Sequence, residues 1–133
     1  MGSLFDVLGS CLMDMAKMGI VEEAKVDSFN VPVYSTTPQE IKKLIERNGC
    51  FNIERIVDIL PQENKLKEFS AQTYSDHTRA VMEVVIKLHF GCNEHTIDHL
   101  FQHLYPKKFE DTLANLMQSM GKTIVLFIIL KRK

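Results

Sequence analysis

The sequence predicts an α/β fold that is rich in helices and poor in strands. Apolar residues recur at steps of three and four in several stretches, which is the spacing of one buried helix face. Only two stretches, near 51–60 and 123–130, have the β-branched and aromatic composition of strands. The second contains an unbroken apolar run from Ile124 to Leu130, which is typical of a strand buried on both faces of a sheet.

Composition limits the classes of protein to consider. A chain of 133 residues has the length of one ordinary domain. The 16 Lys and Arg against 17 Asp and Glu leave no basic excess, so we expect no nucleic-acid partner. Three well-separated cysteines give no disulfide framework and favour a reducing, cytoplasmic setting. The longest apolar run is far short of the ~20 residues that span a bilayer, so we expect no membrane segment.

The N-terminal third predicts three helices. A stripe along 4–18 ends at Gly19, and 21–26 form a short exposed helix that leads into an irregular stretch at 27–34. Thr37 caps the third helix and Glu40 completes a capping box, while Asn48-Gly49 ends it. We expect its buried face to consist of Ile41, Leu44 and Ile45.

The rest of the chain alternates between strands and helices. A strand at 51–60 is closed by Pro61, and 61–70 form a charged loop. A long helix begins at Ala71 or Ser75 and ends at Phe90, followed by helices at 93–105 and 106–120. The long helix is expected to bury Ala80, Val81, Val84, Val85 and Leu88.

The apolar segment Ile124–Leu130 raises a structural difficulty. A strand covered on both faces normally has several neighbours, yet only 51–60 offers another strand, and two strands make a marginal sheet. We therefore interpret 1–133 as a single incomplete domain: the C-terminal part of a larger α/β domain, or a chain whose partner supplies strands. The alternative is a self-sufficient small α+β fold whose own helices enclose the segment.

Motifs for chemistry are sparse. The glycines are too widely spaced for a phosphate-binding loop. His95, His99 and His103 recur every four residues on one predicted helix face, a geometry that allows metal binding. An exposed helix that is rich in histidine is the favoured interpretation, because no second element offers a carboxylate or cysteine to that face. Asp27 and Asn30 offer the hard oxygen donors that Mg²⁺ accepts, but the same residues stabilise Asx turns.

Several segments taken together resemble the plant SABATH family of S-adenosylmethionine-dependent methyltransferases, which act on small carboxylic acids and, in one branch, on purine-alkaloid nitrogens. The specific part is the string Asp27-Ser28-Phe29-Asn30-x-Pro32-x-Tyr34. Supporting matches are Leu12-Met13-Asp14-Met15, Gly19, Glu23, Lys25, Glu40, Gly49-x-Phe51-x-Ile53, Arg79-Ala80-Val81-x-Glu83, Phe90-Gly91, Leu100-Phe101 and the last strand. The chain differs from the family in having no tryptophan and in carrying Val84 where a proline is usual.

The resemblance implies the C-terminal part of a Rossmann-like methyltransferase sheet with a helical cap, in an enzyme that is usually a homodimer. It implies a Mg²⁺ held by the Asp27 carboxylate, the main-chain oxygen of Phe29 and the Asn30 side chain. It also implies that S-adenosylmethionine is bound by segments upstream of those present here. The chain alone is then expected to be inactive, with no cofactor-binding residue of its own.

By the same resemblance, four residues should contact the acceptor: Tyr34, Thr78, Val81 and Thr123. They would shape the pocket and align a carboxylate oxygen with the methyl group, so no catalytic acid or base is assigned. A different class of function remains open, namely a non-catalytic helical interaction module that pairs with a full-length relative.

Overall fold

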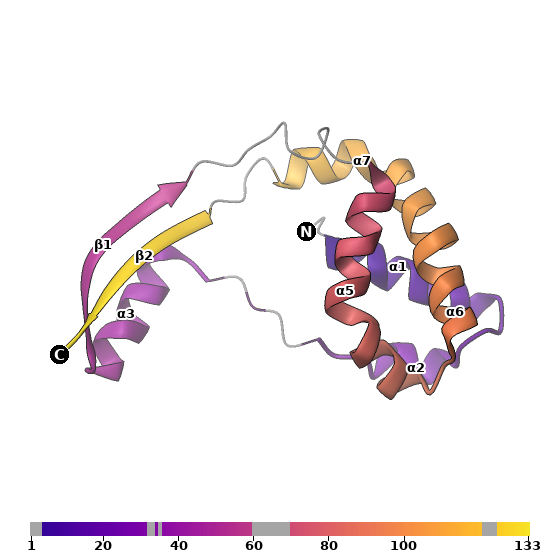
Figure 1. Ribbon diagram of the computed structural model, residues 1–133, viewed down its shortest axis with the longest axis horizontal. Coiled ribbons are helices and arrows are strands. Elements are labelled where there is room, and N and C mark those ends of the chain that lie inside the picture. Colours follow the sequence, from indigo (N-terminus) through magenta and orange to yellow (C-terminus); the bar gives the residue numbers. More distant parts are fainter. Residues whose placement is uncertain (1–3, 32–33, 35, 60–69, 121–124) are drawn as a thin grey trace. The chain divides into compact units, whose positions relative to one another are not determined.

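The computed structural model describes residues 4–31, 34, 36–59, 70–120 and 125–133. The chain divides into two compact units (Figure 1). The helical unit contains residues 1–30 and 62–121, and the strand unit contains 31–61 and 122–133. In the part of the chain that is described, no helix combines the length and apolarity needed to span a membrane.

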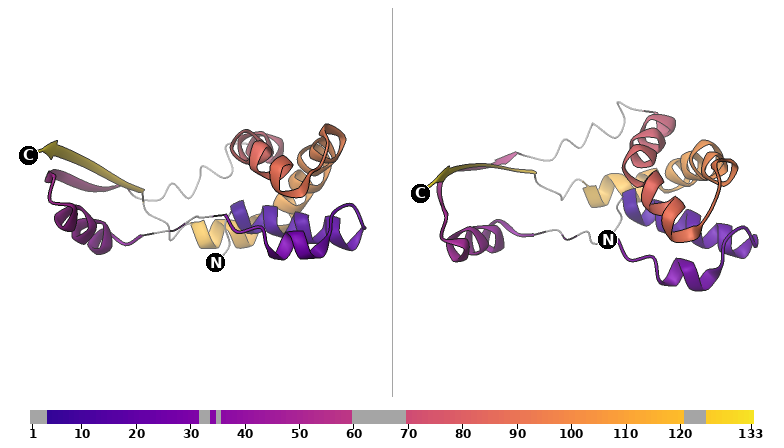
Figure 2. Two further views of the ribbon diagram at one scale, coloured as in Figure 1. Left: turned by 90° about the horizontal axis from the view of Figure 1, so that it is seen from below. Right: turned by 60° about the horizontal axis from the view of Figure 1, so that its bottom comes forward.

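The described part of the helical unit is built from six helical segments. They are α1 (Leu4–Lys17), α2 (Glu23–Asp27), α5 (Ala71–Phe90), α6 (Glu94–His99), the π-helix η1 (Leu100–Leu104) and α7 (Tyr105–Met120). Helix α1 packs against α7 and α2, and α5 packs against α7 and η1 (Figure 2). The expected helices over 4–18 and 21–26 are therefore confirmed, with shifts of one or two residues at their ends.

The core of this unit lies where α1, α5, η1 and α7 meet. Its largest fully buried side chains are those of Tyr105, Phe101, Phe109 and Met15. Five residues of the predicted α1 stripe are buried: Val7, Leu8, Cys11, Leu12 and Met15. The other two predicted members differ: Leu4 is half-buried, and Met18 lies beyond the end of α1 with a side chain that is 52% exposed.

The predicted buried face of α5 is wrong. The valine and leucine stripe is exposed, with fractions of 69% for Val81, 67% for Val84, 47% for Val85 and 80% for Leu88. The helix instead buries Ala71, Ser75, Thr78, Met82, Ile86 and Phe90. This face contains two hydroxyl side chains that are acceptable in the core because each is hydrogen-bonded there.

The stretch expected to be one helix over 93–105 contains a change of helical type. After α6, the Tyr105 N–H bonds the carbonyl of Leu100, five residues back, so the turn is wider than an α-helical one. Pro106 follows and has no N–H to give to the Phe101 carbonyl. Ser75 Oγ donates to that carbonyl, and Gln72 Nε2 donates to it at 3.3 Å. Helix α7 continues without a gap rather than starting afresh at Pro106.

The strand unit contains α3 (Pro38–Asn48), β1 (Phe51–Ile59) and β2 (Val125–Arg132). The capping box of α3 is confirmed: Glu40 N–H donates to Thr37 Oγ1 at 3.2 Å, and Thr37 N–H donates to Glu40 Oε2 at 2.9 Å. Gly49 ends the helix with φ +72°, a conformation that favours glycine. Ile45 is buried as expected, whereas Leu44 is half exposed.

Strands β1 and β2 pair antiparallel along their whole lengths (Figure 1). The register shifts between Ile53 and Arg55, so Glu54 is an extra residue in β1. Such a bulge reverses the side-chain alternation beyond it. As a result Ile53 and Ile56, three residues apart, share one face with Leu130 and Ile128 of β2.

Within these 133 residues the described part of the last strand is not buried on both faces. Its burial by further strands of a larger domain stays a prediction. Its apolar side chains are half-buried or exposed, including Val125, Phe127, Ile129 and Leu130. Among the described residues β1 is the one neighbouring strand, and the helix of this unit does not enclose β2. Thr123, Ile124, Pro61 and most of the predicted 61–70 loop lie outside the described residues.

Candidate functional site

The helical unit contains a small apolar pocket between the start of α1 and the middle of α5. It has a volume of about 160 Å³, is partly open to solvent and is lined by Leu4, Phe5, His77, Thr78, Val81 and Met82. Two residues expected to contact an acceptor, Thr78 and Val81, are thus brought together in one pocket. A cavity of about 150 Å³ with apolar walls is large enough for one benzene ring.

Sequence reasoning missed the other four lining residues. Met82 follows Thr78 by one turn of α5. Both lie on the buried face of this helix, which the sequence did not predict because the valine and leucine residues lie on another side. Leu4 and Phe5 come from the first turn of α1. No local motif marks them, because the pocket forms only where two distant helices meet.

The hydroxyl of Thr78 is bonded inside the core. Thr78 Oγ1 lies 3.0 Å from the Tyr74 carbonyl and 3.0 Å from the Tyr105 hydroxyl. The Tyr105 hydroxyl in turn donates to the Leu4 carbonyl at 3.2 Å. Burial raises the pKa of Tyr105, so this phenol keeps the proton that it donates.

The Asp27–Asn30 string is held at the junction of α2 and α5. Its Phe29 ring lies 5.0 Å from the His89 ring and 5.2 Å from that of Phe90, measured between centroids. His89 Nε2 donates to the Lys25 carbonyl at 2.7 Å and lies 3.3 Å from Ser28 Oγ. The Phe29 side chain is therefore fixed against α5, while the side chains of Asp27 and Asn30 are exposed.

Tyr34 belongs to the strand unit. Its side chain is 77% exposed, and its hydroxyl donates to Glu40 Oε1 at 3.1 Å. That hydrogen bond raises the pKa of Tyr34. The pKa of Glu40 is lowered, first by the Thr37 N–H and then by Tyr34. The role of Tyr34 toward an acceptor stays a prediction, and Thr123 lies outside the described residues.

The described ranges contain no group of three or more His, Cys, Asp and Glu side chains arranged to hold a metal. His95, His99 and His103 therefore do not form the metal site that their spacing allowed. The His99 and His103 rings lie 5.8 Å apart between centroids. Of the predicted Mg²⁺ ligands only Asp27 belongs to these four residue types. The absence of such a group therefore says nothing about the predicted Mg²⁺ site, which stays a prediction.

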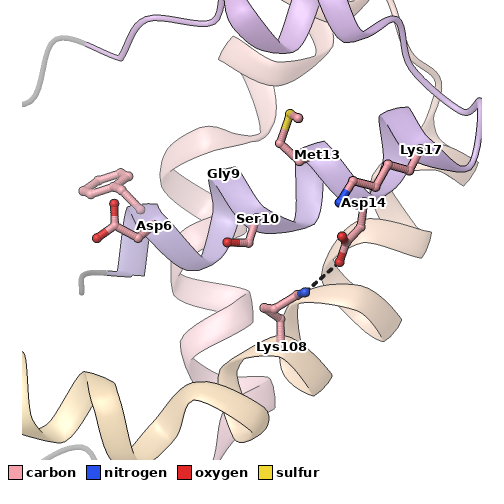
Figure 3. Close-up of a pocket in the computed structure, with 8 residues that line it drawn as sticks. Asp6, Gly9, Ser10, Met13, Asp14, Lys17 and Lys108 are labelled. Atoms are coloured by element: carbon pink, nitrogen blue, oxygen red, sulfur yellow. Dashed lines mark ion pairs between the residues drawn. The ribbon is translucent and has the colours of Figure 1, made fainter. Parts of the chain in front are cut away.

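A second hollow is an open groove along α1 (Figure 3). Its polar lining includes Asp6, Ser10, Lys17 and an ion pair between Lys108 Nζ and Asp14 Oδ2 at 2.7 Å. The hydrogen bond to Asp14 raises the pKa of Lys108. This ion pair joins α7 to α1, and we assign the groove a structural role.

Comparison with known proteins defines the class. The chain matches a solved structure titled "Loganic acid methyltransferase with SAH" with a TM-score of 0.77 and 36% identity, over 98% of this chain and 36% of that one. Loganic acid O-methyltransferase of Catharanthus roseus is 38% identical over 132 residues, which are 99% of this chain and 34% of that protein. Jasmonate O-methyltransferase of Arabidopsis thaliana is 34% identical over 115 residues, 74% of this chain and 29% of that protein. The fold is that of part of a methyltransferase.

The family follows from a match over the whole chain. The model described as "SAM dependent carboxyl methyltransferase" covers residues 1–133. The chain belongs to this family, which confirms the resemblance to SABATH enzymes and the α/β class. The chain spans about a third of the length of the curated relatives that it matches.

Proposed function

We propose that these 133 residues form the acceptor side of an S-adenosylmethionine-dependent methyltransferase that acts on a small carboxylic acid. The observation that carries this proposal is the apolar pocket between α1 and α5, which unites Thr78 and Val81. The printed names of the relatives, which include loganic acid and jasmonate methyltransferases, support a carboxylic acid as the substrate class.

The lining of the pocket suits the hydrocarbon body of such an acid. Among the six lining residues only Thr78 and His77 have polar side chains, and the Thr78 proton is bonded within the core. A carboxylate would lose its water here without gaining a partner from Thr78. We therefore assign the apolar part of the acid to this pocket and its carboxylate to the region outside it.

S-adenosylmethionine supplies the electrophilic methyl group in this family. The task of this chain is to hold the acid so that one carboxylate oxygen faces that group, and alignment of this kind accelerates bimolecular reactions greatly. We propose that the cofactor is bound by a part of the enzyme that these residues do not include, and that 1–133 is a single incomplete domain, inactive alone. We further propose a cytoplasmic homodimer for the complete enzyme.

We also propose a Mg²⁺ site at Asp27, the Phe29 main-chain oxygen and Asn30. A carboxylate, a carbonyl and an amide are the hard oxygen donors that Mg²⁺ binds together with retained waters. The exposed side chains of Asp27 and Asn30 leave room for those waters, and the contacts of Phe29 with α5 fix the main chain between them. The ion would neutralise the carboxylate of the acceptor.

A second candidate function has its own support. Val81, Val84, Val85 and Leu88 form an exposed apolar stripe on α5, and several apolar side chains of β2 are exposed in the other unit. Contiguous exposed apolar side chains are typical of protein interaction surfaces. If this chain is a non-catalytic module that pairs with a full-length relative, that relative would cover these apolar side chains.

Titration of the isotope-labelled chain by methyl NMR tests the proposed function. Benzoate, the smallest aromatic carboxylic acid, should shift the methyl signals of Thr78, Val81 and Met82 saturably. The methyl signals of Ile45 in the strand unit serve as the control and should not move. S-adenosylmethionine should give no saturable shift; tight binding of this cofactor, or pocket methyl groups that ignore benzoate, would contradict the proposal.

A further inference from the structure

Tyr105 occupies a special place behind the apolar pocket. It is the first residue of α7, directly after the π-helix, and its side chain is fully buried. It does not line the pocket itself. Its hydroxyl nevertheless contacts one residue from each of the two helices that form the pocket walls, namely Thr78 of α5 and Leu4 of α1.

The direction of these hydrogen bonds follows from the groups involved. The Leu4 carbonyl can only accept, so the single Tyr105 proton is donated to it over 3.2 Å. Toward Thr78 the Tyr105 oxygen is then the acceptor, over 3.0 Å. The phenol thus connects α5 to the first turn of α1 through one atom.

The wide turn before Tyr105 lies in the core next to the pocket walls. The rings of Phe101 and Tyr105 are both buried, with centroids 6.1 Å apart. The turn is itself attached to α5, since Ser75 and Gln72 donate to the Phe101 carbonyl. Wide turns of this type are frequent at functional sites.

We propose that Tyr105 is a positioning residue that fixes the separation of Leu4 and Thr78 across the acceptor pocket. This inference rests on the proposed function and adds to it a residue that touches no substrate. The single Thr78 proton is shared between the Tyr74 carbonyl and the Tyr105 oxygen. Without the phenol oxygen it is donated to the Tyr74 carbonyl alone, and the hydrogen-bonded link between α5 and the first turn of α1 is lost.

Binding of benzoate to variants of the 133-residue chain tests this role. Tyr105→Phe removes one oxygen and should weaken benzoate binding about three- to tenfold, the range expected for one buried hydrogen bond. Thr78→Val removes the same bond from the other side. The double variant should bind benzoate no more weakly than the weaker single variant, because both changes break one connection.

Thr112→Val is the matched control, since Thr112 Oγ1 also bonds a carbonyl four residues back, that of Lys108 at 2.8 Å, away from the pocket. It should leave benzoate affinity unchanged even where it lowers the melting temperature. Affinities are compared at a temperature where every variant is folded, which separates positioning from stability. Because Thr78 itself lines the pocket, Thr78→Val supports the test but does not decide it. If Tyr105→Phe is unfolded at the common temperature, its affinity is compared with that of the wild-type chain at a lower temperature at which both are folded.

The outcomes distinguish the two proposals. Wild-type chain that ignores benzoate contradicts the acceptor site and this inference together. Wild-type chain that binds benzoate, with equal binding by Tyr105→Phe and Thr78→Val, overturns only the positioning role. Equal weakening by Thr112→Val would also overturn it, because the effect would then be one of general stability.

Discussion

His89 Nε2 lies 2.7 Å from the main-chain oxygen of Lys25 and donates its proton there. This contact joins the last turn of α5 to α2, the helix that ends at Asp27. The ring of the same histidine lies against Phe29. One side chain therefore holds both sides of the segment to which we assign the Mg²⁺ ligands.

Replacement of His89 by alanine should lower the free energy of unfolding by about 1–2 kcal/mol, because a hydrogen bond and a ring contact are lost together. Mg²⁺ affinity should fall as well, since the Phe29 main chain loses its support. Urea unfolding and Mg²⁺ titration measure the two effects. His95→Ala, at an exposed position on α6, should change neither; a comparable loss in that variant would contradict the assignment.

Two positions on α5 separate the observed buried face from the expected one. Met82→Ala should destabilise the chain by about 2–4 kcal/mol, because it opens a cavity in the core. Val84→Ala, two residues further along, should cost less than about 0.5 kcal/mol because Val84 is exposed. Thermal unfolding followed by circular dichroism compares them. A larger loss for Val84→Ala would mean that its stripe is covered in solution.

The lowered pKa of Glu83 should make the free energy of unfolding depend on pH in the acid range. Hydrogen bonds from Lys87 and then Arg79 lower its pKa from 4.5 to about 2. Between these values the unfolded chain binds a proton that the folded chain does not, so stability falls as the pH drops from about 4.5 toward 2. Glu83→Gln should flatten this part of the profile, measured by urea unfolding. Glu110→Gln, at an exposed site on α7, should leave the slope unchanged.

The raised pKa of Cys11 should make the free energy of unfolding decrease as the pH rises in the alkaline range. Burial raises the pKa of its thiol from 9.0 to about 12. Above pH 9 the unfolded chain releases a proton that the folded chain keeps, so stability should decrease toward pH 12 by about 1.4 kcal/mol per pH unit at most. Cys11→Ala should lose this slope, although it starts from a lower stability at neutral pH. Identical slopes in the two proteins would show that the thiol is accessible to water.

The sequence predicts helix ends better than helix faces. Thr37, Glu40 and Gly49 act within one or two turns of chain, so local chemistry suffices to place the ends of α3. The face that α5 buries depends on which helices pack against it. Four large aliphatic residues on one side of the helix favour burial of that side. The other side contains Ser75 and Thr78, and the contacts of their hydroxyls with Phe101 and Tyr105 far along the chain are not visible in the sequence.

Strand pairing shows the same limit. The irregular alternation of Ile53, Ile56 and Val57 is explained by the extra residue Glu54, which no composition rule marks. For the candidate site, family resemblance indicated Thr78 and Val81, and the structure places both in one pocket. Leu4, Phe5 and Tyr105 could not be found this way, since they reach the site only through tertiary contacts.

The carbonyl of Phe101, left without a helical donor by Pro106, takes its donors from side chains of α5. The π-turn is thus completed by residues nearly thirty positions earlier, and a peptide of 94–120 alone would lack them. Segments that depend on each other in this way open and close as one cooperative unit. Amide hydrogens of α5 and of the residues around Phe101 should accordingly exchange with solvent deuterium in concert.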